Sequence, residues 1–372
     1  MATPLTTRTN QTGMTGSVNH RMIELARHAR GLTQKELAER MACAQGSLSK
    51  LEQGLIPVTE DWLNALSRAL HYPPDFFMQH GGITPAGIKY RRARKKLSAR
   101  LADRIDAENN IRARIIGELL RSVEIEHEDI PSLPLEDYGS PQEAARALRE
   151  RWRVERGPIP NLTRLFERNG GIVVLADFHT PKFDGVYYLF PNLPSIVFLN
   201  DSKPGDRLRF SHAHEIGHLV MHQLPIVAEE AEPQADEFAA EFLMPAADIR
   251  RHLFNLNLEK AANLKLVWGT AMAAIIRRAK DLQTITPNRY KTLNIQLRKA
   301  CKGVQEPASV SIPPEQPRML IDLVHIHRTE LGYSAEELSA TLHLHHDEYE
   351  ARYEPRQKTA KIIRLDNARR WA

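Results

Sequence analysis

The sequence predicts a multidomain chain with an all-α amino-terminal domain, an α+β domain in the middle and a helical carboxy-terminal region. Three observations lead to this prediction. The chain has 372 residues, whereas a domain usually takes about 100–200. Helical periodicity alone fills residues 19–82, and short strand-like runs begin only after residue 170. Proline-rich stretches near residues 130 and 310 separate these patterns.

The composition is that of a soluble globular protein, which we expect in the cytoplasm. Hydrophobic residues make up 42% of the chain and charged residues 26%. No apolar run approaches the roughly 20 residues that cross a bilayer, so no membrane partner is expected. Residues 1–18 are polar and lack the apolar segment of a secretory signal, which predicts a disordered arm. The two cysteines, Cys43 and Cys301, are expected to remain reduced.

Residues 19–82 predict a domain of short helices joined by tight turns. Apolar periodicity marks three helices, in "MIELARHAR", "TQKELAERMA" and "AQGSLSKLEQG". A further helix, "TEDWLNALSRAL", stops at the paired prolines of "HYPPDFF". When a tight turn joins the second and third helices of such a unit, the third helix can enter the major groove of DNA.

This domain resembles the Xre-type helix-turn-helix family. Thr33 and Gln34 open the second helix and Gly54 lies on the third, as in that family. The resemblance implies a double-stranded DNA operator as partner, and it implies four residues that face DNA: Gln34, Gln45, Ser47 and Lys50. Amide side chains suit adenine edges, and a lysine suits phosphate or guanine. Because operators are commonly palindromic, we expect a homodimer.

Two residues of the turn depart from the family pattern. Ala42 stands where the family usually has glycine, and Ala44 stands where a capping hydroxyl is common. We therefore expect a turn that is less firmly fixed, although present. The alternative interpretation of residues 19–82 is a small helical bundle that binds another protein; polar residues on the outer face of the third helix favour DNA.

Residues 83–130 are predicted to form a basic helical linker. Eleven basic residues stand against four acidic ones between Lys89 and Arg121. This stretch contains no proline and one glycine, which predicts a long, solvent-rich helix from Lys89 to about Val123. Such a charge run is either a solvated face or a contact for the DNA backbone.

Residues 131–301 predict the α+β domain. A helix is expected to begin at Ser140, with Pro141 at its first position and Glu143 able to complete a capping box. After a second helix come three strand-like runs, "IVVLA", "VYYLF" and "SIVFLN". The pair Asp184-Gly185 is a tight-turn signal between the first two runs.

The stretch "RFSHAHEIGHLVMH" carries the strongest chemical signal. His214 and His218 are four residues apart, so on a helix both imidazoles project from one face and can bind one metal ion. Glu215 lies between them and can serve as a general base toward a water that zinc activates. A polar stripe on a helix is the structural alternative, but it does not require these residue types at these offsets.

A catalytic zinc site commonly takes a carboxylate as its third protein ligand. Glu232, at the start of the next predicted helix, can supply it. Asp236, one turn further, can accept the outer N–H of a ligating histidine. His212 and His222 are expected to pack or to support the ligands rather than bind the ion.

From about Ser140 to Ala279 the chain is similar to the ImmA/IrrE family of zinc metallopeptidases. The similarity is carried by the histidine helix, "EPQADEFAAEFLMP", "DGVYYLF", "IVFLND" and "LKLVWGTAMAAIIRRA". It implies a zincin-like fold that binds Zn²⁺ through His214, His218 and Glu232, with Glu215 as general base. It also implies a specific protein substrate, a repressor or an antitoxin-like protein. Candidates for stabilising the oxyanion are Tyr187, Tyr188 and His212.

The sequence is compatible with three functions. The first is a DNA-binding regulator with a zinc-dependent endopeptidase domain, which we favour because Glu215 is needed for hydrolysis but not for sensing zinc. The second is a regulator whose metal domain senses a signal or binds a partner without proteolysis. A general degradative protease is the third, and fusion to a DNA reader argues against it.

The carboxy-terminal region predicts a diverged copy of the first domain. Residues 302–317 read as a linker, and residues 318–372 as a helix-turn-helix-like unit. Within it, "GYSAEELSATLHLHHDEYEARY" aligns without gaps on "GLTQKELAERMACAQGSLSKLE". Because its third helix is acidic and repels phosphate, we expect a protein contact. The contact is either with the arginine-rich segment of the same chain or with the DNA-binding face of a substrate.

Overall fold

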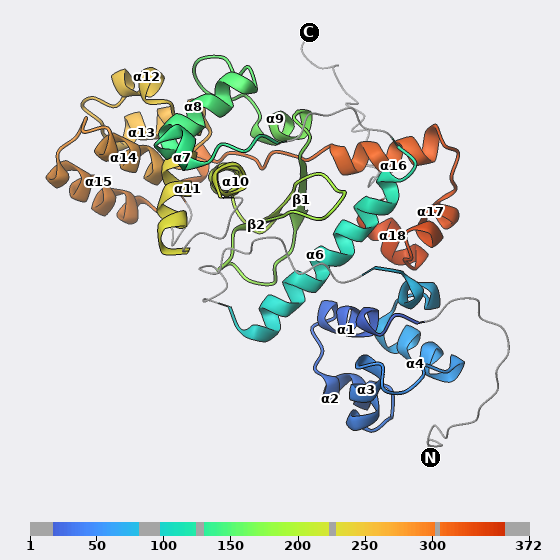
Figure 1. Ribbon diagram of the computed structural model, residues 1–372. Coiled ribbons are helices and arrows are strands. Elements are labelled where there is room, and N and C mark those ends of the chain that lie inside the picture. Colours follow the sequence, from blue (N-terminus) through green and yellow to red (C-terminus); the bar gives the residue numbers. More distant parts are fainter. Residues whose placement is uncertain (1–17, 82–96, 124–129, 223–227, 302–305, 354–372) are drawn as a thin grey trace, which may run out of the picture.

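The computed structural model describes residues 18–81, 97–123, 130–222, 228–301 and 306–353 (Figure 1). The expected disordered arm, apart from its last residue, lies outside these ranges. The basic residues before Leu97 and the tail after Tyr353 also lie outside them. Among the described helices, none combines the length and the apolar character that crossing a bilayer requires.

The amino-terminal domain is a bundle of short helices. These are α1 (His20–Ala29), α2 (Gln34–Arg40), α3 (Gln45–Glu52), α4 (Glu60–Leu70) and the 3₁₀ helix η1 (Pro74–Met78). Thr33 and Glu36 form a capping box at the start of α2, which satisfies backbone N–H groups that a helix terminus leaves unpaired. Met22, Leu48 and Leu66 are fully buried in the core between the helices.

The middle domain places a small mixed sheet beside a pair of long helices (Figure 1). Its three strands are β1 (Ile172–Ala176), β2 (Gly185–Tyr188) and β3 (Ile196–Asn200), in the order β1-β3-β2. β3 pairs in parallel with β1 and antiparallel with β2. Three helices precede the sheet: α7 (Leu135–Tyr138), α8 (Pro141–Arg151) and α9 (Leu162–Arg168).

The expected turn at Asp184-Gly185 is wrong as a connection between neighbouring strands, because β3 lies between β1 and β2. Gly185 instead opens β2 at a close approach, where an added Cβ would lie 2.9 Å from Leu199 Cδ2. The Asp184 carboxylate lies 2.6 Å from Lys203 Nζ and 2.8 Å from an Arg207 guanidinium nitrogen. The sequence signal therefore reflects the close packing of Gly185 against β3 and the ion pairs of Asp184 with Lys203 and Arg207.

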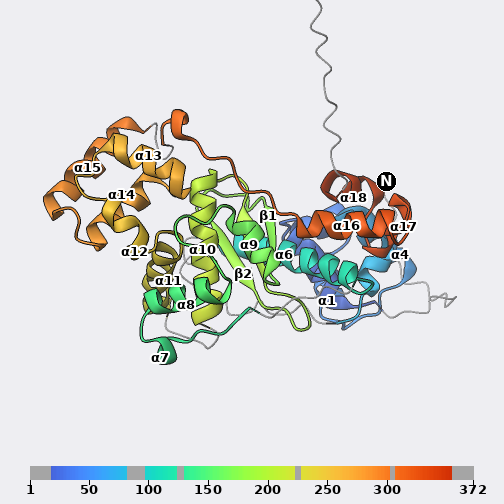
Figure 2. The ribbon, with the colours of Figure 1, turned by 90° about the horizontal axis from the view of Figure 1, so that it is seen from above.

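The long helices are α10 (Gly205–Met221) and α11 (Ala228–Leu243), which pack against each other. α11 begins four residues before the expected start at Glu232, so Pro233 lies inside the helix. Beyond them lie α12 (Ala246–Ile249), η2 (Arg250–His252), α13 (Leu258–Trp268), α14 (Met272–Asp281) and α15 (Pro287–Ala300). Figure 2 shows these last helices at the end of the molecule opposite the amino-terminal domain.

The prediction of a solvent-rich linker helix is wrong for the described part of the basic segment. Helix α6 (Ala99–Leu120) begins after a Ser98 cap and lies between the amino-terminal domain and the sheet. Ile111 and Ile115 join the core of the amino-terminal helices, whereas Ile105 and Ile116 join a core with the sheet. Apolar residues thus occupy two faces of α6, and its charged residues fill only the remaining surface.

The carboxy-terminal unit repeats the first three helices of the amino-terminal domain. It consists of α16 (Met319–Thr329), α17 (Ala335–Thr341) and α18 (His346–Tyr353), and the alignment of the sequences places α17 on α2 and α18 on α3. Ser334 and Glu337 reproduce the capping box of α2. In the turn, His343 has a φ of 54° where Ala42 has 50°.

The expected linker before this unit is anchored to the middle domain where the structure describes it. Glu306 lies 2.7 Å from Lys265 Nζ, and Glu315 forms an ion pair with Arg209 of α10. The backbone amides at the start of α16 donate to Glu167 of α9. This extended segment, which includes η3 (Ala308–Val310), therefore runs as a strap from α13 past α10 to α16.

Candidate metal centre and nucleic-acid interface

Three side chains from α10 and α11 converge at one point. The Nε2 atoms of His214 and His218 lie 3.0 Å apart, and each lies 3.8 Å from a carboxylate oxygen of Glu232. Their ligand atoms all fall within 4.8 Å of one another. Across the described ranges, this is the only such group of histidines, cysteines or carboxylates. The geometry brings together the three residues that the sequence predicts as ligands.

The outer ring nitrogens of both histidines have polar neighbours. His214 Nδ1 lies 2.9 Å from Asp236 Oδ1, in the place expected of Asp236. His218 Nδ1 lies 3.0 Å from His222 Nδ1, and His222 Nε2 lies 2.9 Å from Gln234 Oε1. If both Nε2 atoms bind a metal, each Nδ1 carries a proton and donates it outward. Asp236 then accepts one of these hydrogen bonds, and neutral His222 accepts the other while its Nε2–H donates to Gln234.

This donor set fits zinc. Two imidazoles and one carboxylate are a common set of protein ligands for a catalytic zinc ion. The outer hydrogen bonds hold the rings in the tautomer that leaves Nε2 unprotonated. Burial and the neighbouring His214 and His222 lower the pKa of His218 well below its ordinary value, so its ring is neutral as a ligand requires.

Glu215 lies next to the ligand cluster without belonging to it. Its side chain is buried and points toward β2, where the backbone N–H of Tyr187 donates to its carboxylate. Burial raises the pKa of Glu215 to about 7, with His214 acting in the opposite direction and Glu232 in the same. A carboxylate with such a pKa can accept and return a proton near neutral pH.

A cleft of about 500 Å³ opens over these residues. One wall is β2 with the residues before it, and the other is α10 and α11. Residues new to the site are Lys182, Arg207 and Ser211, which line the cleft. The three candidates for stabilising the oxyanion do not line it. The Tyr188 hydroxyl donates to Asp106 of α6, and the Tyr187 and His212 side chains are buried in the domain core.

In the amino-terminal domain, a polar network includes two of the four residues expected to face DNA, Gln34 and Gln45. Gln45 donates to Gln34 over 2.7 Å, and Gln34 donates to Glu52 over the same distance. Glu52 in turn accepts two hydrogen bonds from Arg27. Gln45 and Lys50 are exposed, whereas Gln34 and Ser47 are half-buried. The network fixes the amide groups of two helices relative to each other, as base recognition needs.

The two residues that depart from the family pattern have visible structural effects. Ala42 adopts a left-handed backbone, with φ at 50°, although it has a side chain. Ala44 precedes α3 and provides no side-chain cap. The turn keeps its shape because the Cys43 N–H donates to the Ala38 carbonyl over 3.0 Å.

Comparison with known families agrees with the assignment of both domains. Residues 22–75 match the family model of a helix-turn-helix domain, and residues 168–280 match a peptidase family model described as the IrrE N-terminal-like domain. The chain is a helix-turn-helix domain fused to an ImmA/IrrE domain. No curated protein matches it as a relative.

The ImmA/IrrE domain contains support residues that its sequence motifs did not reveal. Gln234 orients His222, but a glutamine has no motif of its own and becomes visible only when α10 and α11 pack together. Arg207 and Asp184 form an ion pair at the cleft, and Asp184 lies in a stretch read as a turn. Arg207 lies seven residues, or about two helical turns, before His214. Helical spacing could therefore have placed it on the same face as the ligand.

Proposed function

We propose that this helix-turn-helix ImmA/IrrE protein is a cytoplasmic transcriptional regulator that carries a zinc-dependent endopeptidase. Its substrate would be one specific protein, a repressor or an antitoxin-like protein. The observation that carries the proposal is Glu215, whose proton-accepting carboxylate lies in the same cleft as His214, His218 and Glu232. A site that only sensed or stored zinc would need the three ligands and not this group.

The residues of the cleft have two roles in the proposed peptide hydrolysis, metal binding and proton transfer. Zinc, when bound by His214, His218 and Glu232, supplies Lewis-acid polarisation of the scissile carbonyl and of the attacking water. Glu215 accepts the proton of that water and passes it to the leaving amine. Its raised pKa suits both transfers at neutral pH, because the carboxylate is neither a very weak base nor a strong acid there.

The cleft also suits an extended peptide. β2 is an outer strand of the described sheet and forms a wall of the cleft. An extended substrate can add to such an edge by main-chain hydrogen bonds, which would carry its scissile bond past Glu215. Main-chain hydrogen bonds do not distinguish one peptide sequence from another. We therefore expect side chains that line the cleft, such as Lys182 and Arg207, to select the substrate.

The test uses zinc-loaded protein and the repressor-like products of neighbouring genes as substrates. We expect wild type to cut one of them at a single position and Glu215→Gln to retain zinc while losing cleavage, because Glu215 does not touch the ion. His214→Ala and Glu232→Ala should lose zinc, measured by metal analysis with mass spectrometry. Full zinc retention in His214→Ala would remove the site, and equal cleavage by Glu215→Gln would remove its role.

We further propose that α2 and α3 bind an operator through Gln34, Gln45, Ser47 and Lys50. Support comes from the exposure of Gln45 and Lys50 and from the network that holds the two glutamines together. A mobility-shift titration with the full chain tests this. Replacing Gln45 by alanine should weaken binding and relax the preference for one base pair, by about 1–3 kcal/mol for a lost bidentate contact. Unchanged affinity and sequence preference would argue against the assignment.

A further inference from the structure

The carboxy-terminal unit keeps the shape of a DNA reader but not its reading side chains. In the alignment, Ala335, His346, Glu348 and Ala351 stand where the first domain has Gln34, Gln45, Ser47 and Lys50. The capping box and the left-handed turn residue recur at equivalent positions in the two units, which supports the alignment. A carboxylate in this surface repels phosphate, and alanine makes no polar contact with a base edge.

The same surface binds the first domain instead. The Glu348 carboxylate accepts hydrogen bonds of 3.1 and 3.2 Å from the Arg30 guanidinium at the end of α1. The Asp347 carboxylate lies 3.2 Å from His71 Nε2, just after α4. Paired contacts between a guanidinium and a carboxylate are among the stronger and more directional polar contacts in proteins.

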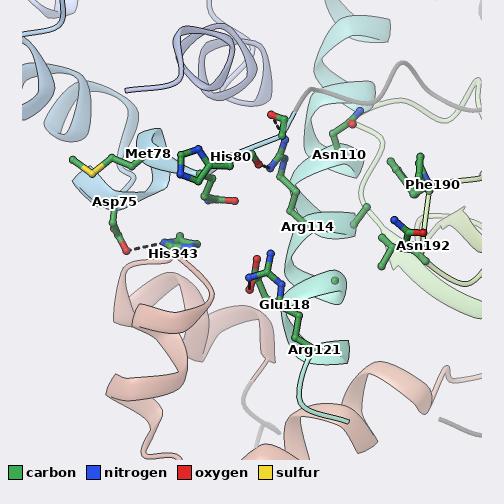
Figure 3. Close-up of a pocket in the computed structure, with 16 residues that line it drawn as sticks. Asp75, Met78, His80, Asn110, Arg114, Glu118, Arg121, Phe190, Asn192 and His343 are labelled. Carbon is green, nitrogen blue, oxygen red and sulfur yellow. Dashed lines mark hydrogen bonds and ion pairs between the residues drawn. The ribbon is translucent and has the colours of Figure 1, made fainter. Parts of the chain in front are cut away.

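The turn before α18 extends this contact. The His343 ring lies 2.7 Å from Asp75 of η1, and Figure 3 shows the pair at the edge of a cavity of about 740 Å³ between η1, α6 and the sheet domain. His343 corresponds to Ala42, the residue that shapes the turn of the DNA reader. In a DNA-binding helix-turn-helix, the turn before the third helix and the first turn of that helix face DNA. Here both are directed at the first domain.

Apolar packing joins the two units in one core. Leu338, Leu342 and Tyr349 are buried in the same cluster as Tyr72 and Phe76. The first domain therefore has its α1 face covered by α6 and the end of α4 covered by the carboxy-terminal unit. The face that carries Gln45 and Lys50 stays exposed.

We infer that residues 319–353 are a built-in partner that takes the place of a second helix-turn-helix subunit. Regulators of this type ordinarily read palindromes as symmetric dimers. Here the second copy of the fold belongs to the same chain, has lost the reading residues and uses that surface to hold the first copy. One chain then reads one asymmetric DNA element. The inference rests on the proposed DNA binding, and it replaces the homodimer expected from the sequence.

The binding mode is tested by selecting duplexes from a random-sequence library with the full wild-type chain, followed by native mass spectrometry of the complex. We expect a single non-palindromic element, without an inverted copy about 10 base pairs away, and one chain per duplex. An inverted repeat bound by two chains would overturn the inference while leaving DNA recognition intact. Failure to enrich any sequence would remove DNA recognition and the inference together.

The docking contact is tested with Glu348→Arg, which places like charge against Arg30. Hydrogen exchange of the backbone from Leu70 to Met78 should speed up by roughly tenfold or more, because an ion pair with a buried carboxylate becomes a repulsion. Glu350→Arg is the matched control on the same helix, since Glu350 is exposed and pairs only with His346 among the described contacts. Circular dichroism and Glu348→Gln separate undocking from misfolding. Equal protection in all variants would overturn the docking role of Glu348.

Discussion

At the scale of single residues, the left-handed turn residues show where side chains cost stability. Ala42 and His343 occupy the same position in the two units, and both adopt a positive φ. A left-handed backbone costs an ordinary residue about 1–2 kcal/mol. His343 gains a contact with Asp75 that offsets this cost, whereas the Ala42 side chain is exposed. We therefore expect strain in the first turn that has no local compensation.

Ala42→Gly should stabilise the first domain by about 1 kcal/mol, after the greater freedom of glycine in the unfolded chain is subtracted. Native-state hydrogen exchange of the buried amides in α2 and α3 should slow by roughly fivefold. Ala38→Gly is the opposite control, since it lies inside α2 and should destabilise by a similar amount. Faster exchange in Ala42→Gly would contradict the strain.

The pairing of His222 with His218 gives a second prediction at this scale. His222→Leu should raise the dissociation constant for zinc by about 10–100-fold, because the ring that orients a ligand is lost while all three ligands remain. Competition with a coloured chelator measures it. The control is His212→Leu on the same helix, since His212 Nε2 is buried without a hydrogen-bond partner and touches no ligand. An unchanged constant in His222→Leu would show that the ring only packs.

The convergence of His214 and His218 was predictable from sequence because helical spacing alone places them on one face. A carboxylate on the next helix followed from the needs of the metal. His222 and Gln234 could be paired only after α10 and α11 were packed together, because side-chain contact across helices depends on their crossing. The oxyanion candidates failed for the same reason: tyrosines in a strand alternate between core and α6, and neither side points into the cleft.

At the scale of elements, carboxylates of the strap accept hydrogen bonds from backbone amides at the starts of helices. Glu315 accepts from the amides of Leu162 and Thr163 at the start of α9 and pairs with Arg209 of α10. Burial alone would raise the pKa of Glu315, but Arg209 and these amides outweigh it and lower the pKa below the ordinary value. A carboxylate with a depressed pKa stabilises the fold above its unfolded pKa and loses that effect as the pH falls.

Glu315→Gln should therefore destabilise the ImmA/IrrE domain by about 3 kcal/mol at neutral pH, because Arg209 stays buried without its partner. Below about pH 4.5 the difference from wild type should shrink, since protonation removes the same charge in wild type. Thermal unfolding from pH 7 to pH 3 measures it. Glu259→Gln, at an exposed position of α13, should match wild type throughout. A constant difference across this range would contradict the linkage.

The elements themselves were largely predictable, whereas their neighbours were not. All three strands of the sheet were placed within a residue or two by their apolar runs, but their order requires knowing that β3 inserts between β1 and β2. Helix α6 was predicted as a helix and misjudged in burial, because counting its charges hid the two apolar faces. Helix α11 was expected to begin at Glu232, yet it begins four residues earlier, so that Pro233 lies inside it.

At the scale of the whole molecule, the proposed DNA-binding face lies at the opposite end from α15, so only charges near that face should change the salt dependence of DNA binding. Lys50→Gln should weaken binding to specific and nonspecific duplexes alike. It should also reduce the slope of log affinity against log salt by about one, because a protein with one phosphate contact fewer releases fewer counterions on binding. Fluorescence anisotropy at several salt concentrations gives the slope. Lys291→Gln, exposed on α15 at the far end, is the charge-matched control. Equal slopes for both variants would place Lys50 away from phosphate.

The core shared by the first and last units also sets the timing of synthesis. Tyr72 and Phe76 leave the ribosome long before Leu338 and Tyr349, which belong to the same buried cluster. At about 5–20 residues per second, translation keeps this apolar face open for roughly 10–50 s. A nascent chain thus has an incomplete first domain until its last helices emerge. The need for a chaperone should therefore be greatest while the middle domain is being synthesised. A ribosome that stalls there would leave an aggregation-prone fragment with an exposed apolar surface.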